Sequence, residues 1–321
     1  MKSRKDSAYV NGVIAVKEKK LLKDKLAKMC ASGEEEALRL LRESGFGGGD
    51  PSLGVEELTL ADEREIDAFI REYAPSDEAE EYLLSPRDFH NAKAIVKAQY
   101  LKCDPAPMLG SDGRYSADEL QKIIGAGENG KLPKELDGAI KETEKLLAGE
   151  NPSGAEVGFL FEKAQFAYLT RVLKKFGACR KLLVRRADMT NLLTCFRAES
   201  AEAAKKFLVD GGSLKQEDFS CIFEGAEATK KRFEKSEYKD FVKKLSLAKE
   251  EKKPFTEAEK TLEGFETDFF SEKPYELSGQ GNFLYYVFRR RTENENVRIV
   301  FVCLKAGLSE AEIKKRLRGS V

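Results

Sequence analysis

The residues whose types and spacing could do chemistry are acidic residues that stand three positions before an asparagine. The pairs are Asp88 with Asn91, Asp188 with Asn191, and Glu293 with Asn296, and a weaker copy without the acid lies at Asn11. Positions i and i+3 share one face of a helix, so each carboxylate and amide point the same way. A carboxylate can act as a general acid or base. Asparagine, however, is a poor helix former, and its repeated use indicates a particular bonding partner. We therefore predict structural rather than catalytic roles for these residues, with each asparagine tying its helix to a neighbouring turn.

The segment from Gly125 to Lys131 resembles a phosphate-binding loop. Its sequence GAGENGK satisfies G-x-G-x-x-G, and Leu132 stands where a magnesium-binding hydroxyl would complete G-x-x-x-x-G-K-[ST]. Such a loop must leave a strand and enter a helix, whereas residues 116–124 are predicted to form a capped helix. Glu128 would also place a negative charge in the phosphate cradle. We interpret the segment as a turn and keep a nucleotide-binding enzyme that uses Gly125–Lys131 as a minor alternative.

The other reactive residue types form no recognisable catalytic, cofactor or metal site. With a single histidine, His90, neither a zinc site nor a nucleophile–histidine pair is expected. Six cysteines are scattered without paired spacing and are typical of reduced thiols in a cytoplasmic protein. Arginine clusters at residues 289–291, 185–186 and 316–318 could bind acidic partners, although solvated helix faces are the default interpretation.

A second pattern follows the asparagine segments. A serine stands three residues before a glutamate or glutamine, as in a capping box that begins a helix. The four serines are Ser32, Ser116, Ser213 and Ser309. We therefore predict a short capped helix at each of them.

The composition indicates an all-helical protein. Tryptophan is absent, charged helix formers dominate, and no alternation typical of paired strands is present. Lys plus Arg and Asp plus Glu are equal at 56 each, which disfavours a dedicated nucleic-acid binder. No apolar run approaches the roughly 20 residues of a bilayer span, and no signal peptide is recognisable. We expect a soluble, cytosolic chain.

Two local expectations follow from the pattern of residues. Residues 1–30 are predicted to form a basic amphipathic helix, whose charged face we interpret as solvated rather than as a site for acidic lipids. Pro75 and Pro86 are expected to bracket a short connector before the first acid–asparagine helix.

The spacing of the pairs indicates an internal repeat. The acids are 100 and 105 residues apart, which exceeds most solenoid units and favours triplication of a helical subdomain. We predict three helical bundles, at residues 1–127, 128–225 and 226–321, within one continuous elongated unit.

Taken in order, these motifs resemble the C subunits of the bacterial and archaeal V-type ATPases, which are related to the d subunit of the eukaryotic V-ATPase. The resemblance covers essentially the whole chain. It rests on Tyr9-Val10-Asn11, Asp88 to Asn91, Asp188 to Asn191, Glu293 to Ile299 and the ending Gly307 to Leu317. The chain departs from the family where Gly12, Ile14 or Lys93 replaces an arginine, and where Ser320-Val321 replaces a final Tyr-Val.

The resemblance implies a fold and a function. Proteins of this family are all-helical funnels of three bundles around a pseudo-threefold axis. They sit at the cytoplasmic face of the membrane on the proteolipid ring and receive the central stalk, formed by the D and F subunits, without catalysing a reaction. Accordingly we expect no cofactor, nucleic acid or small-molecule substrate. The short helices at Ser32, Ser116, Ser213 and Ser309 are then a possible socket interface, and an independent helical adaptor is the alternative.

Overall fold

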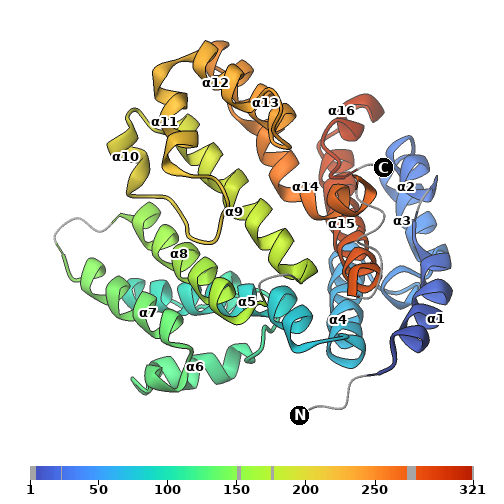
Figure 1. The fold of residues 1–321 in the computed structure, drawn as a ribbon. Coiled ribbons are helices and arrows are strands. Elements are labelled where there is room, and N and C mark those ends of the chain that lie inside the picture. Colours follow the sequence, from blue (N-terminus) through green and yellow to red (C-terminus); the bar gives the residue numbers. More distant parts are fainter. Residues whose placement is uncertain (1–4, 23, 150–152, 175–176, 273–279, 320–321) are drawn as a thin grey trace. The chain divides into compact units, whose positions relative to one another are not determined.

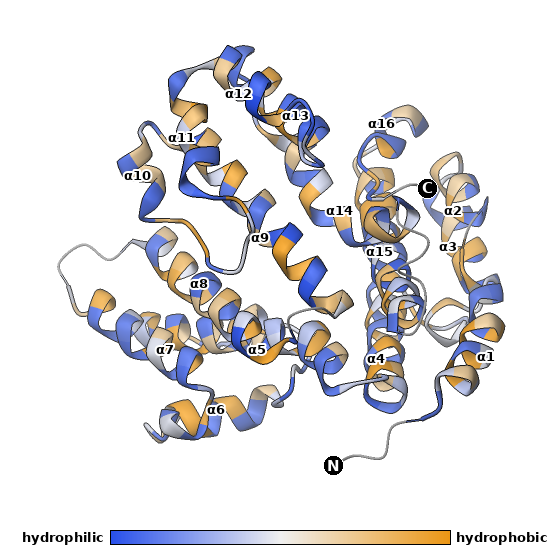
Figure 2. Cartoon of the chain, viewed as in Figure 1, coloured by the Kyte–Doolittle hydropathy of each residue, from blue (hydrophilic) through white to orange (hydrophobic). Residues whose placement is uncertain are grey.

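The computed structural model describes residues 5–22, 24–149, 153–174, 177–272 and 280–319, and these residues contain α-helices and short 3-10 helices but no strand (Figure 1). The predicted all-α class is confirmed. Each helix shows both apolar and polar positions, as expected when one side packs into a core (Figure 2). In the described part of the chain, no helix is both long and apolar enough to cross a membrane.

The chain divides into two compact units, one formed by Met1–Ala79 with Glu263–Val321 and the other by Glu80–Leu262. The predicted bundles at 1–127, 128–225 and 226–321 do not coincide with these units. The reason is that helices near the start of the chain pack against the last long helix. The threefold division stays a prediction.

The first unit is built around the long helix α15. Its helices are α1 (Ser7–Lys17), η1 (Glu18–Lys20), α2 (Asp24–Cys30), α3 (Glu34–Glu43), η2 (Phe46–Gly48), α4 (Val55–Tyr73), the end of α14 (Thr256–Glu272), α15 (Gln280–Lys305) and α16 (Glu310–Lys314). The apolar stripe of α4 is buried at Ile66, Phe69 and Ile70. The Phe69 ring lies 5.5 Å from that of Phe283 and 5.0 Å from that of Tyr286 on α15. These contacts place α4 along α15.

The second unit contains the other two acid–asparagine helices, α5 and α9. Its helices are α5 (Asp77–Leu101), η3 (Ala106–Met108), α6 (Ala117–Gly125), η4 (Asn129–Lys131), α7 (Lys134–Leu147), α8 (Gly154–Val172), α9 (Ala178–Arg197), α10 (Ala201–Lys205), α11 (Gln216–Glu224), α12 (Ala226–Phe233), α13 (Lys239–Glu250) and the start of α14. Helix α8 buries Phe161, Phe166 and Leu169 in the core of this unit. Helix α5 begins in the first unit and runs into the second.

Two local predictions are wrong. Residues 1–30 do not form one helix, because Leu21 is extended (φ −62°, ψ 143°) and separates α1 and η1 from α2. The connector predicted between Pro75 and Pro86 is largely helical, and Pro86 lies inside α5. Leu83 and Leu84, just before this proline, are buried. Core packing of the helix therefore outweighs the hydrogen bond that a proline removes.

A helix follows each of the four serines, as predicted, but only two of the serines take part in the cap. Ser116 caps α6, since its Oγ accepts from the Glu119 N–H at 3.1 Å. Ser309 precedes α16, and the Glu312 carboxylate accepts from its N–H and its hydroxyl. Ser32 instead donates its hydroxyl to the Lys28 carbonyl at the end of α2. Ser213 donates its hydroxyl to Asp188. Helix α11 begins three residues later, and the Asp218 carboxylate accepts from the N–H of its N-cap residue, Lys215.

Candidate functional site

The three predicted asparagines make the same pair of hydrogen bonds. Each side-chain amide donates to a backbone carbonyl and accepts from a backbone N–H in a segment 18 to 22 residues further along the chain. Asn91 holds Gly110 N and Ser111 O, Asn191 holds Val209 N and O, and Asn296 holds Arg318 N and O, at distances of 2.8 to 3.3 Å. Because an amide side chain offers both a donor and an acceptor, it pairs with the backbone as another peptide group would. We call this arrangement the asparagine clamp.

The acids also repeat their geometry. Asp88 accepts from Tyr115 N, Asp188 from Leu214 N and Glu293 from Leu22 N, at 2.9 to 3.1 Å. In each case the donor residue lies two positions before a helix, α6, α11 or α2 respectively. In the third copy, the N–H that binds the acid belongs to Leu22, near the start of the chain. The spacing of the motifs along the sequence could not indicate this partner.

Asp188 makes the most extensive of these contacts. Its buried carboxylate also accepts from the Ser213 N–H and hydroxyl and from the Tyr238 hydroxyl at 2.8 Å. Burial, and after it the neighbouring Asp188, raises the pKa of Tyr238, so this phenol remains a donor. All of these partners belong to the protein itself. The arrangement is structural and leaves Asp188 no free face for acid–base chemistry.

Two glycines that the sequence patterns did not single out fit beneath these carboxylates. A Cβ atom built on Gly113 would lie 2.1 Å from Asp88 Oδ1, and one on Gly212 would lie 2.3 Å from Asp188 Oδ1. Such distances are far below van der Waals contact, so both positions require glycine. The signal was present in the sequence, since each glycine follows its acid by about the same interval.

The weaker copy at Asn11 does not form a clamp in the described part of the chain. Asn11 is exposed, and its Oδ1 accepts from the Asn282 side chain at 2.9 Å. Its surface position gives it no backbone segment to hold.

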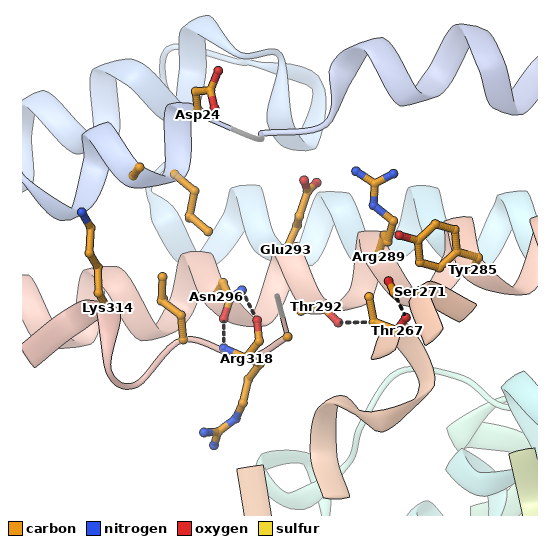
Figure 3. Close-up of a pocket in the computed structure, with 14 residues that line it drawn as sticks. Asp24, Thr267, Ser271, Tyr285, Arg289, Thr292, Glu293, Asn296, Lys314 and Arg318 are labelled. Atoms are coloured by element: carbon orange, nitrogen blue, oxygen red, sulfur yellow. Dashed lines mark hydrogen bonds between the residues drawn. The ribbon is translucent and has the colours of Figure 1, made fainter. Parts of the chain in front are cut away.

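The third acid–asparagine pair borders a cavity of about 830 Å³ in the first unit. Helices α2, α14, α15 and α16 supply the lining, and Figure 3 shows Glu293, Arg289, Asn296 and Arg318 around it. The clamp between Asn296 and Arg318 forms part of the wall, as the dashed lines in Figure 3 show. The cavity therefore combines hydroxyl, acidic and basic groups on a rigid frame.

Glu293 is the group in this cavity that titrates near neutrality. Burial raises its pKa to about 7, although the hydrogen bond from Leu22 and the charges of Arg289 and Arg290 oppose the shift. The Arg289 guanidinium lies 5.4 Å from the Tyr285 ring and 3.3 Å from the Glu18 carboxylate. Near pH 7 the cavity thus holds a carboxyl that changes charge readily.

Arg290 corrects the interpretation of the arginine cluster as a solvated face. Its side chain is 13% exposed and forms an ion pair with Asp62, which is fully buried on α4. The Asn294 amide donates to the Thr59 carbonyl and to Asp62, at 2.9 and 3.0 Å. This network joins α15 to α4.

The remaining candidate residues bind within the protein itself or are buried. Gly125 ends helix α6, as the turn interpretation requires, and the Lys131 ammonium pairs with Glu128. His90 is exposed, with Nε2 3.2 Å from the Met108 carbonyl oxygen. All six cysteines are free. Burial raises the pKa of the Cys195 thiol to about 12, so this cysteine is not a reactive thiolate.

The structure defines an all-helical protein whose repeated polar residues hold its own backbone. A family model described as "ATP synthase (C/AC39) subunit" matches residues 10–316, so the chain belongs to that family, the C subunits of V-type ATPases. The chain is also similar to the C subunit of the V-type sodium ATPase of Enterococcus hirae. The two are 21% identical over 270 residues, which cover 82% of this chain and 81% of that protein.

Proposed function

We propose that this chain is the non-catalytic rotor component that couples the central stalk, formed by the D and F subunits, to the membrane proteolipid ring. In this role it transmits torque between the two and sits peripherally at the cytoplasmic face of the membrane. The three acid–asparagine helices would belong to three similar bundles arranged as a funnel around a pseudo-threefold axis.

The recurrence of the same backbone contacts at α5, α9 and α15 is the observation that carries this proposal. Each helix holds one segment through its asparagine and a second through its acid. A part that transmits torque must resist deformation, and side chains that clamp loops onto long helices supply this resistance. An independent adaptor would have no need for the same device in three copies.

The cavity of the first unit is a candidate for part of the socket. Helix α16, which begins at Glu310 directly after Ser309, contributes Lys314 to its lining, and this ammonium is half exposed in an ion pair with Glu310. A helical stalk tip that carries charged residues could exchange such a surface ion pair for its own at little expense, because exposed pairs contribute only about 0–1 kcal/mol. The helices near Ser32, Ser116 and Ser213 are proposed to line the same mouth.

The test is a binding measurement with the full chain. Wild-type protein is expected to co-purify with the D–F stalk and with the proteolipid ring. The reversal Lys314→Glu should weaken D–F binding, whereas Lys231→Glu, at an exposed lysine of α12 in the second unit, serves as the control. Failure of the wild-type chain to bind either partner would contradict the proposed function. Equal effects of the two reversals would remove the cavity from the socket.

A further inference from the structure

The first helix of the chain presents an uncharged surface in a protein where 35% of residues are charged. Helix α1 has the sequence SAYVNGVIAVK, and Lys17 is its only charged residue. Val10 and Ile14 face the core. The exposed residues of the helix include Ala8, Gly12 and Ala15, with Tyr9 55% and Val16 64% exposed. The exposed face thus carries Tyr9 and Val16 beside the polar Ser7 and Asn11 and has no acidic residue. Large apolar side chains left at the surface indicate a contact outside the chain.

The segment that contains this helix is strongly basic. Residues 1–30 hold nine Lys or Arg against three Asp or Glu, whereas the whole chain is neutral. The acids are occupied internally, since Asp6 accepts from the backbone N–H groups that begin α1 and Glu18 pairs with Arg289. Asp24 lines the cavity of the first unit. The lysines of this segment are therefore the charged groups that a partner can contact.

Three of its lysines are available for such a partner. Lys19, Lys25 and Lys28 are exposed, and none of them forms an ion pair with a residue that the structure describes. Lys5 differs, because it pairs with Glu72 at 2.8 Å and lies 4.8 Å from the Tyr73 ring. The available lysines follow α1 closely in the sequence, so apolar exposure and positive charge occur in one short segment.

We propose that α1 and the lysines that follow it bind an anionic phospholipid surface. Lysines are attracted to such a surface, while Tyr9 and Val16 enter the headgroup region, where tyrosine is favoured. A protein partner is less well matched, because protein interfaces depend on large side chains seated in pockets. Three of the seven exposed residues of α1 are alanine or glycine, and only Tyr9 and Val16 offer larger apolar side chains. Binding is independent of the stalk and is weak for a single chain, since two apolar side chains bury little area.

The experiment is co-sedimentation of the full chain with lipid vesicles. The wild-type chain should bind vesicles that contain phosphatidylglycerol and should not bind vesicles of phosphatidylcholine alone. It should dissociate from the anionic vesicles as salt is added. Each lysine near an anionic surface contributes about fivefold in affinity, so Lys19→Gln, Lys25→Gln and Lys28→Gln together should weaken binding on the order of 100-fold. The matched control replaces three exposed lysines of the second unit, Lys231, Lys235 and Lys243, by Gln.

A second pair of variants tests the apolar contribution. Val16→Ser should weaken vesicle binding several-fold, whereas Val302→Ser, at a valine of α15 that is 69% exposed, should not. The proposal is overturned if the wild-type chain does not bind anionic vesicles, or if both lysine triples reduce binding equally. It is also overturned if the α1 variants affect only binding to the protein ring. Loss of D–F binding with vesicle binding intact would instead contradict the proposed function.

Discussion

At the scale of single residues, the asparagine clamp explains why this residue type recurs in helices that it does not favour. Only an amide side chain supplies a donor and an acceptor side by side, which matches the N–H and C=O of a segment that lacks regular partners. Asn191 satisfies both groups of Val209, which are buried with it. The propensity lost in the helix is small compared with the penalty for two unsatisfied buried backbone groups.

Replacement of the clamp residue should therefore destabilise the protein. Asn191→Asp keeps the shape but cannot donate to the Val209 carbonyl, and it places a charge in a buried site. We expect a loss of about 2–4 kcal/mol in the free energy of unfolding, measured with urea. The same change at the exposed Asn11 should alter the value by about 0.5 kcal/mol or less. Similar losses at the two positions would show that Asn191 is not a clamp.

The surroundings of the glycines predict opposite effects on stability for two Gly→Ala replacements, one beside Asp188 and one in open space. Gly212→Ala forces a methyl group against Asp188 and should destabilise the protein by about 1–3 kcal/mol. In contrast, a Cβ on Gly158, inside α8, would meet nothing within 4 Å. Gly158→Ala should stabilise the protein by up to about 1 kcal/mol through helix propensity. Thermal unfolding of both variants measures the difference, and a neutral Gly212→Ala would contradict the geometry at Asp188.

Glu293 predicts a dependence on pH. Its pKa is raised from 4.5 to about 7 in the folded protein, so the folded state holds this proton more tightly than the unfolded state. The contribution of Glu293 to stability should therefore fall as the pH rises from 4.5 to 7 and stay constant above. Glu293→Gln keeps an oxygen for the Leu22 N–H and should gain on the order of 1–3 kcal/mol relative to wild type across this range.

Urea unfolding of the two proteins over this range of pH measures the effect. Glu312→Gln is a control of opposite sign, because hydrogen bonds from Ser309 lower the pKa of Glu312. That carboxylate stabilises the protein above its ordinary pKa of 4.5, and its contribution is lost only as the pH falls below this value. Between pH 4.5 and 7 the Glu312→Gln variant should therefore be less stable than wild type by a nearly constant amount. If the unfolding free energies of wild type and Glu293→Gln change in parallel with pH, the pKa of Glu293 is not raised as predicted.

At the scale of elements, the buried network of α15 and α4 is the main connection that sequence patterns did not indicate. Arg290 lies in a run of three arginines, which suggests a solvated face, yet it meets Asp62 in the interior. Asp62→Asn would leave the buried guanidinium with only the half-exposed Glu65 carboxylate, 3.7 Å away, as its counter-charge. We expect a loss of about 3–5 kcal/mol in unfolding free energy.

Chemical denaturation measures this loss, and a second replacement distinguishes charge from hydrogen bonding. Asn294→Ala removes one neutral partner of Asp62 and should have a smaller effect, about 1–3 kcal/mol. If Asp62→Asn proves milder than Asn294→Ala, the ion pair does not join the two helices as described.

The helices themselves were largely predictable, because they depend on local pattern. The stripe of Ile66, Phe69 and Ile70 has the spacing of an amphipathic helix and is buried in α4. The spacing of acid and asparagine does not indicate that the two bind different backbone segments. Partners distant in sequence were not predictable. Nothing near Glu293 indicates that it binds Leu22, 271 residues away. Likewise, Pro86 signals a break, but the burial of Leu83 and Leu84 within α5 overrides it.

At the scale of the whole molecule, the third copy of the repeat includes a residue from near the start of the chain, Leu22. The segment before α2 binds Glu293 as the segments before α6 and α11 bind their acids. A repeat whose last copy is closed by the first residues of the chain is what a ring of three bundles requires. This relation supports the proposed funnel of three bundles around the stalk.

The structure of the chain assembled with the D–F stalk and the proteolipid ring tests this claim most directly. We predict that α5, α9 and α15 are related by rotation about one axis, with the stalk tip on that axis and the cavity beside Glu293 facing it. A stalk bound elsewhere on the chain, or three helices without a common axis, would contradict the proposed funnel.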